Sequence, residues 1–165
     1  MSYHEYQNRE IIHLTLKDVD VLLEMQKRIY PEAFVEKLEY LKKLITNSDF
    51  NIGVVVEGKL VGFLFVTKDC MTSDDQIFLY DIGILPEYQK RGLGSLLLDY
   101  FCKMALKKNL KIYICCRGTS YPMFSNREKL EKMGYKIARY EFEKDGYFEA
   151  YGIHEDSHEI YLEPL

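Results

Sequence analysis

A short stretch in the middle of the chain combines two basic residues, two glycines and a serine. Its residues are Gln89, Lys90, Arg91, Gly92, Leu93, Gly94 and Ser95, and it separates the apolar run IFLYDIGIL from a second apolar run, LLLDYFCKMAL. A helix N-terminus presents unpaired N–H groups and a partial positive charge, and glycine lets the backbone approach a ligand closely. A serine near the N-cap adds a hydroxyl. The stretch therefore predicts an anion site at a strand–turn–helix junction.

Two familiar phosphate motifs do not fit this stretch. The P-loop requires G-x-x-x-x-G-K-[ST], which the sequence lacks. The dinucleotide-binding pattern requires a third glycine where this chain has Leu97, and it stands early in a βαβ unit, whereas this turn lies in mid-chain after a hairpin. A plain tight turn between a strand and a helix is the structural alternative.

A single acidic residue, Asp81, interrupts the apolar run before the turn. Because side chains alternate along a strand, Asp81 shares a face with Leu79 and Gly83. A lone carboxylate in a central strand is costly unless it is used or paired. We therefore expect either a functional carboxylate or one that pairs with a buried arginine or lysine. Gly83 is unusual inside a strand and is typical of a bulge or a close ligand approach.

The elements that position these residues follow from the hydrophobic periodicity. We expect strands over 10–15, 76–85, 111–116, 135–152 and 158–165, a hairpin over 51–69, and helices over 16–30, 33–47, 94–109 and 124–134. Gly134 is well placed as a left-handed C-cap. This order is typical of an α/β (α+β) fold, with a mixed central sheet flanked by about four helices. No repeat or linker is visible, so we expect one domain over 1–165.

The composition of the chain bears on its partners and its location. A net charge of −4 does not suggest a nucleic-acid partner, and no apolar run is long enough for a membrane span. Four cysteines show neither metal spacing nor a disulfide framework, and we expect Cys102, Cys115 and Cys116 in the core. The polar N-terminus lacks the apolar core of a signal peptide. A cytoplasmic protein with reduced thiols is expected.

The segment Gln89–Gly94 resembles the Q/R-x-x-G-x-G/A motif of the GNAT superfamily, the Gcn5-related N-acetyltransferases. The preceding IGILPEYQ resembles the strand and lead-in of that family, and LEKMGYK resembles its later helix end. The expected element order also matches, from about Ile11 to Leu162. The resemblance implies the GNAT acyl-CoA N-acyltransferase fold and acetyl-CoA as the cosubstrate. Backbone N–H groups of the turn would then hold the pyrophosphate.

The resemblance also assigns roles along the preceding strand. Backbone groups of Ile82, Gly83 and Ile84 would meet the pantetheine arm and the acetyl carbonyl, and an N–H there would stabilise the oxyanion. The strand looks like that of aminoglycoside 3-N-acetyltransferases and polyamine acetyltransferases, which carry an aspartate beside the amine. Asp81 would accordingly bind or deprotonate a primary amine that attacks the thioester directly in a ternary complex.

The acid that protonates the departing thiolate is less well marked. The family often has a tyrosine four residues before the glycine of its late motif, where this chain has Leu130. The usual asparagine at the helix start is replaced by Met123, and Asn126 comes three residues later. Tyr121 is the candidate substitute. A packing tyrosine, with solvent protonating the thiolate, is the alternative.

The C-terminal part of the chain is acidic. Five of its carboxylates belong to strands that flank the acceptor groove in this family: Glu141, Glu143, Glu149, Glu155 and Asp156. A cationic small molecule of the aminoglycoside or polyamine type suits this charge, and a lysine-rich peptide suits it also. The alternatives are a protein or peptide N-acetyltransferase and a non-catalytic CoA-binding sensor. A homodimer is compatible with the family.

The sequence HEDSH, His154 to His158, satisfies the zinc-protease pattern H-E-x-x-H. That pattern needs a helix to bring both histidines to one face. Gly152 precedes it and the strand-like EIYLEPL follows, so we expect a polar loop between two strands and no metal.

Overall fold

The chain divides into two compact units. The computed structural model describes residues 8–68, 71, 73–147 and 155–165. The first unit is formed by Met1–Thr67 with Asp81–Phe101, and the second by Lys68–Tyr80 with Cys102–Leu165. Both β4 (Gln76–Ile84) and α3 (Leu93–Lys107) continue from one unit into the other. A single domain over 1–165 stays a prediction.

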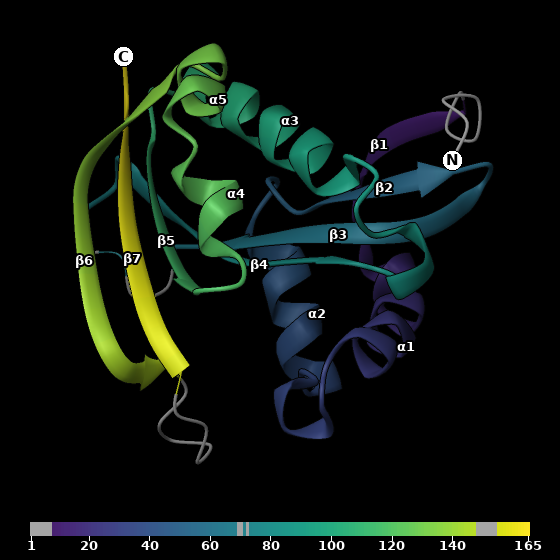
Figure 1. The fold of residues 1–165 in the computed structure, drawn as a ribbon. Coiled ribbons are helices and arrows are strands. Elements are labelled where there is room, and N and C mark those ends of the chain that lie inside the picture. The colour runs from purple at the N-terminus through teal and green to yellow at the C-terminus, as the bar shows by residue number, and fades with distance from the viewer. Residues whose placement is uncertain (1–7, 69–70, 72, 148–154) are drawn as a thin grey trace. The chain divides into compact units, whose positions relative to one another are not determined.

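The first unit holds the antiparallel strands β1, β2 and β3, the second half of β4, and three helical segments. Besides parts of β4 and α3, its elements are β1 (Arg9–His13), α1 (Val19–Ile29), α2 (Leu38–Asn47), β2 (Ile52–Val56) and β3 (Lys59–Thr67), with 3₁₀ turns at Leu16–Asp18, Glu32–Phe34 and Pro86–Tyr88. α1 and α2 pack together and against β3. Figure 1 shows this pair on one face of β2 and β3, with the first half of α3 on the other.

Local chemistry explains why these elements form where they do. Glu57 and Gly58, at φ 50° and 82°, make a two-residue left-handed turn between β2 and β3, so the predicted hairpin is confirmed. Asn51 is fully buried; its amide donates to the carbonyl of Leu44 over 2.8 Å, and its oxygen accepts from the N–H of Val66 over 2.9 Å. One side chain thus joins α2 to β3 without leaving a buried polar group unpaired.

The second unit holds the first half of β4 and the neighbouring strands β5, β7 and β6, in that order. Its elements are β5 (Lys111–Arg117), α4 (Tyr121–Ser125), α5 (Arg127–Lys132), β6 (Tyr135–Tyr147) and β7 (Glu155–Pro164). β4 runs parallel to β5, with Gln76–Leu79 opposite Lys111–Ile114, while β5 and β6 are each antiparallel to β7. Strand directions are therefore mixed, as expected.

Several predicted boundaries are wrong. The helix expected over 33–47 begins only at Leu38, because Pro31 and the extended Val35 interrupt the chain before it. The helix expected over 124–134 is two short helices with the non-helical Asn126 between them. Asn126 accepts from the N–H of Lys129 over 3.1 Å and so caps the second. Gly134, at φ 92°, confirms the predicted C-cap.

Two further expectations need correction. β7 already begins at Glu155, so Glu155–His158 lie in a strand and not in a loop; His154 lies outside the described residues. Cys115 is only half-buried, because the alternation of β5 turns it away from the face that buries Cys116, whereas Cys102 is buried as expected. Burial raises the pKa of Cys116 to about 12. Cys70 falls outside the described residues.

Candidate active site

The glycine-rich turn has an unusual backbone. α3 begins at Leu93, and the first N–H bonded within its turn is that of Leu96, which donates to the carbonyl of Gly92 over 3.0 Å. Ser95 therefore lies within the first helical turn. Two turn residues adopt left-handed torsions, Lys90 at φ 62° and Gly92 at φ 83°. A left-handed non-glycine residue costs of order 1–3 kcal/mol, and such residues cluster at functional sites.

This geometry suits an anion. Leu93, Gly94 and Ser95 carry first-turn N–H groups that a helix cannot satisfy internally, and they stand at its positive end. The side chains of Lys90 and Arg91 are exposed beside them. A Cβ placed on Gly92 would meet no atom within 4 Å, so the space over this part of the turn is open. The hairpin turn at Gly58 also has open space, but only the turn at Gly92 combines it with the N-terminus of a helix.

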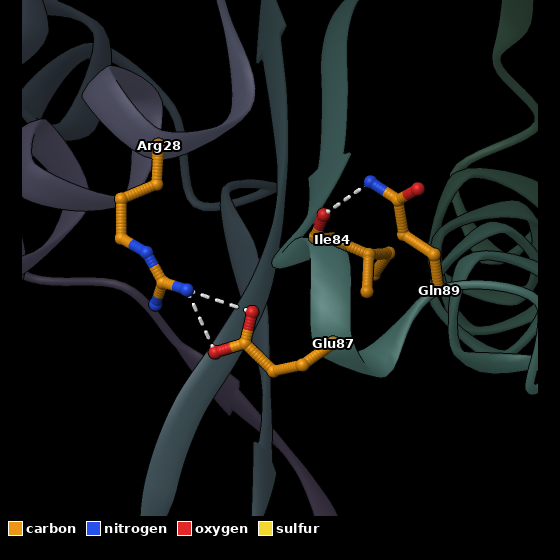
Figure 2. Close-up of polar contacts among 4 residues, drawn as sticks. All are labelled: Arg28, Ile84, Glu87 and Gln89. Atoms are coloured by element: carbon orange, nitrogen blue, oxygen red, sulfur yellow. Dashed lines mark hydrogen bonds and ion pairs between the residues drawn. The ribbon is translucent and has the colours of Figure 1, made fainter.

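Side-chain contacts attach the turn to its surroundings within the first unit. The Nε2 amide of Gln89 donates to the carbonyl oxygen of Ile84, the last residue of β4, over 2.9 Å. Before the turn, Glu87 accepts from one guanidinium nitrogen of Arg28 in α1, at 2.8 and 2.9 Å to its two oxygens. Figure 2 shows both contacts, with Gln89 turned back toward the strand and Arg28 reaching across to Glu87. Strand end, turn and helix α1 are thus connected.

The hydrogen bonds of Glu87 affect its titration. Its pKa is held below the ordinary glutamate value by its backbone hydrogen bond first, and then by the hydrogen bond from Arg28. The carboxylate is therefore ionised throughout the neutral range.

The half-exposed Asp81 lies in β4, at the start of its second half. Its Oδ1 accepts a hydrogen bond of 2.6 Å from the hydroxyl of Tyr30, and the same hydroxyl lies 3.3 Å from the carbonyl oxygen of Ile82. A short O–H···O distance is typical of a charge-assisted hydrogen bond to a carboxylate. Asp81 therefore accepts a hydrogen bond from an uncharged donor at the end of α1. This arrangement is compatible with its predicted role in binding or deprotonating the amine.

Gly83 has a packing reason for its identity. A Cβ at this position would lie 2.5 Å from Cζ of Phe63, so the phenyl ring occupies the space a side chain would need. Gly62 is similarly constrained, because its Cβ would lie 2.5 Å from Cδ1 of Ile84. A side chain of β3 thus packs over the β4 backbone at Gly83, and a side chain of β4 packs over the β3 backbone at Gly62. The role of Ile82–Ile84 along a pantetheine arm stays a prediction.

Tyr121 is the first residue of α4, in the second unit. Its half-buried ring stacks on the imidazole of His158, with 4.4 Å between ring centroids. The Tyr140 hydroxyl lies 2.6 Å from Nδ1 of His158. Tyr121 is therefore part of an aromatic–imidazole cluster that the sequence did not indicate. Its predicted role as an acid is not tested by this arrangement, since Asp81 belongs to the other unit.

The comparison with protein families covers the part of the chain that contains the turn. The model of the Acetyltransferase (GNAT) family matches residues 19–135, which include β4, the turn and α3. The chain belongs to the GNAT acetyltransferase family. It is an acetyl-CoA-dependent N-acetyltransferase, and the predicted fold and cosubstrate are both confirmed.

Solved structures agree with the GNAT fold. The ribosomal-protein-S18-alanine N-acetyltransferase of Escherichia coli has a TM-score of 0.69 at 19% identity, covering 94% of this chain and 93% of that one. Arabidopsis thaliana NAA60 in complex with acetyl-CoA has a TM-score of 0.69 at 16% identity, covering 93% and 98%. The loading GNATL domain of CurA from Lyngbya majuscula has a TM-score of 0.72 at 15% identity, covering 95% and 98%. A comparison with curated protein sequences finds no match.

The described turn fits acetyl-CoA. Its open space at Gly92, its first-turn N–H groups and its two exposed basic side chains are what a pyrophosphate requires. The turn from Gln89 to Ser95 would hold the nucleotide end of the GNAT cosubstrate, which supplies the acetyl group as a thioester. The family tyrosine is replaced in this GNAT chain by Leu130, which is only 1% exposed and belongs to the core.

The acidic strands of this GNAT chain are partly neutralised. Glu141 lies 3.5 Å from Arg139, and Glu155 lies 3.7 Å from Arg117. Asp156 accepts from the N–H of Asp145 over 3.2 Å. Glu143 is exposed, and Glu149 lies outside the described residues.

Among the described residues, no group of three or more His, Cys, Asp or Glu side chains is arranged to hold a metal ion. Within the same residues, no helix has the length and apolar character needed to cross a membrane.

Sequence reasoning missed the residues that support the site. Tyr30 and Arg28 lie 51 and 59 residues before their partners Asp81 and Glu87. No local pattern marks either residue; the only signal is that Tyr30 precedes Pro31 at the end of a predicted helix.

Proposed function

We propose that this GNAT enzyme transfers the acetyl group of acetyl-CoA to a primary amine of a cationic small molecule of the aminoglycoside or polyamine type. The observation that carries the proposal is the carboxylate of Asp81. It is half-exposed on β4, it is oriented by Tyr30, and it lies three residues before the end of the strand that leads into the turn.

The proposed reaction assigns Asp81 two tasks. The carboxylate attracts the ammonium form of the acceptor and takes one of its protons, directly or through a water molecule. The neutral amine then attacks the thioester carbon, a C–N bond forms and the C–S bond breaks. After the attack the nitrogen loses a second proton to solvent, and the departing thiolate takes up a proton to become the thiol. Tyr121 is the proposed donor of that proton, with solvent as the alternative.

The charge of the second unit supports a cationic acceptor. The chain from 139 to 165 carries eight acidic and two basic residues. Glu141, Glu143 and Asp145 on β6 are all exposed, beside the exposed Arg139 and Lys144. Such a surface raises the local concentration of cations.

A peptide or protein acceptor is the second candidate. Two similar structures are a ribosomal-protein-S18-alanine N-acetyltransferase and Arabidopsis thaliana Naa50 in complex with the bisubstrate analogue CoA-Ac-MVNAL. Both names describe acceptors with a peptide amine. At 19% and 17% identity these structures share the fold, and the acceptor must be tested separately.

The test is thiol release from acetyl-CoA with spermidine, aminoglycosides, amino acids and peptides with free N-termini or lysines. Asp81→Asn is measured beside the wild type, and Asp20→Asn, which removes an exposed carboxylate from the first turn of α1, is the control. We expect turnover with a cationic small molecule, lost in Asp81→Asn while acetyl-CoA still binds. Turnover with peptides alone would establish the second candidate. Wild-type turnover in Asp81→Asn would refute the role of Asp81.

A further inference from the structure

Tyr30 joins the end of α1 to the central strand. It is the residue after α1, with extended torsions of φ −116° and ψ 152°, and its N–H donates to the carbonyl of Gln26 over 2.8 Å. From this place its half-buried side chain reaches Asp81, 51 residues further along the chain. The hydroxyl has a single proton and two oxygen atoms within reach, Oδ1 of Asp81 at 2.6 Å and the carbonyl of Ile82 at 3.3 Å.

Contacts of the preceding helical turn hold the segment that carries Tyr30 in place. Gln26 is fully buried one turn earlier, and its Oε1 accepts the N–H of Glu36 over 2.9 Å. Its Nε2 has no hydrogen-bond partner among the residues that the structure describes. Pro31 follows Tyr30 and restricts its backbone to extended torsions. The position of the Tyr30 hydroxyl is therefore set by the backbone on both sides, which is what a positioning group requires.

We infer that Tyr30 is a positioning residue for Asp81 in acetyl transfer. Its hydroxyl fixes the orientation of the carboxylate that receives the ammonium proton. The inference rests on the proposed function, because Tyr30 acts on the reaction only through Asp81.

The carbonyl oxygen of Ile82, the second hydrogen-bond acceptor within reach of Tyr30, matters for the proton transfer. While Asp81 is ionised, it is the stronger acceptor, and the Tyr30 proton points to Oδ1. Once Asp81 has taken a proton from the acceptor amine, its oxygen accepts less strongly. The Tyr30 proton can then turn to the carbonyl of Ile82, so the hydroxyl has an acceptor in both charge states of Asp81. The carboxylate gains a proton without leaving a half-buried donor unpaired.

A double-mutant cycle tests the inference. The proteins are wild type, Tyr30→Phe, Asp81→Ala and the double variant, measured as kcat and KM with the amine of the panel that the wild type acetylates fastest. Tyr100→Phe is the matched control. Tyr100 lies in the same unit, and its hydroxyl makes no hydrogen bond that the structure records among the described residues, where its ring meets His13 edge-on. Melting temperatures establish that each variant is folded.

Tyr30→Phe is expected to lower kcat by roughly 10-fold to 100-fold, as misplacement of a catalytic group does, with an unchanged KM for acetyl-CoA. In the Asp81→Ala background the same substitution should change kcat by less than about 2-fold, because the group it positions is gone. Tyr100→Phe should match the wild type. This pattern would support the inference.

Two results would overturn the role of Tyr30 while leaving the proposed function intact. If Asp81→Ala loses turnover while Tyr30→Phe keeps wild-type kcat, Asp81 acts without Tyr30. If Tyr30→Phe costs the same factor in both backgrounds, Tyr30 has a merely structural role. If the panel gives no turnover, or Asp81→Ala retains wild-type kcat, the proposed function itself fails and the role of Tyr30 fails with it.

Discussion

The side-chain amide of Gln89 donates to the carbonyl oxygen of Ile84 over 2.9 Å, which joins the first residue of the turn to the last residue of β4. The contact explains why the first position of the motif needs a side chain that can donate. An amide also leaves the turn without an added negative charge. The contact thereby ties the turn to the end of the strand that carries Asp81.

Loss of this contact should weaken binding of acetyl-CoA. Gln89→Ala is expected to raise its KM by roughly 3-fold to 10-fold, the equivalent of about one net hydrogen bond. Gln89→Glu should raise it further, since the glutamate cannot donate when ionised and repels a phosphate. Steady-state kinetics with varied acetyl-CoA measures both effects. Equal KM values in wild type and Gln89→Glu would show that the contact has no part in the site.

The ion pair of Arg28 and Glu87 should make stability depend on pH. The pKa of Glu87 is lowered in the folded state, so its contribution is present above the ordinary glutamate value and is lost as pH falls through the lowered one. The melting temperature of Glu87→Gln should therefore lie slightly below that of the wild type near pH 7. The difference should shrink as pH falls below the ordinary glutamate pKa, and it should vanish only below the lowered pKa of the folded state. Glu24→Gln, which breaks an exposed ion pair within α1, controls for the change in charge. A difference that grows toward acid would contradict the prediction.

Two glycines offer a matched test of the turn. Gly92 and Gly58 have φ values of 83° and 82°, and a Cβ on either would meet no atom within 4 Å. Alanine at each position should therefore cost a similar amount of stability, of order 1 kcal/mol, measured by urea unfolding. Only Gly92→Ala should also raise the Kd for CoA, because its methyl group would enter the space that the proposed phosphate site needs. Equal Kd values in the two variants would place the phosphate elsewhere.

Gly83 should be intolerant of substitution for a packing reason. Gly83→Ala is expected to lower the free energy of unfolding by about 1–3 kcal/mol, because the new methyl group collides with the Phe63 ring. Adding Phe63→Leu should recover part of that loss, so the double variant will be more stable than the sum of the two single effects. Urea unfolding of the four proteins measures the coupling. Strict additivity would mean that the ring does not determine the choice of glycine.

Much of the fold could be predicted because its signals are local. The left-handed residues Glu57, Gly58 and Gly134 lie where sequence rules place a hairpin turn and a helix C-cap. The errors in helix boundaries arose where the hydrophobic pattern of a helix continued across residues that interrupt it. The extended residues before Leu38 shortened one helix, and Asn126 divided another by capping its second half.

The site was predictable only in part, for a different reason. The turn has its own sequence pattern, so residues from Gln89 to Ser95 could be found without coordinates. Asp81 was recognisable as a lone charge in an apolar strand. Tyr30 was not, because its role depends on a contact between segments far apart in the chain, and neither its spacing nor its surroundings differ from those of a helix-end tyrosine.

The division of β4 and α3 between the two units has a consequence for synthesis of the chain. The first unit is built from 1–67 and 81–101, so it cannot be completed until Phe101 has left the ribosome. The residues of the first unit before 68 can be joined by those after 80 only once the intervening segment 68–80 has been made, and closing such a loop costs more chain entropy than closing a local hairpin. The nascent hairpin of β2 and β3 can form early, whereas Asp81 meets Tyr30 only late in folding. Assembly of the candidate active site is thus among the last events before the second unit is finished.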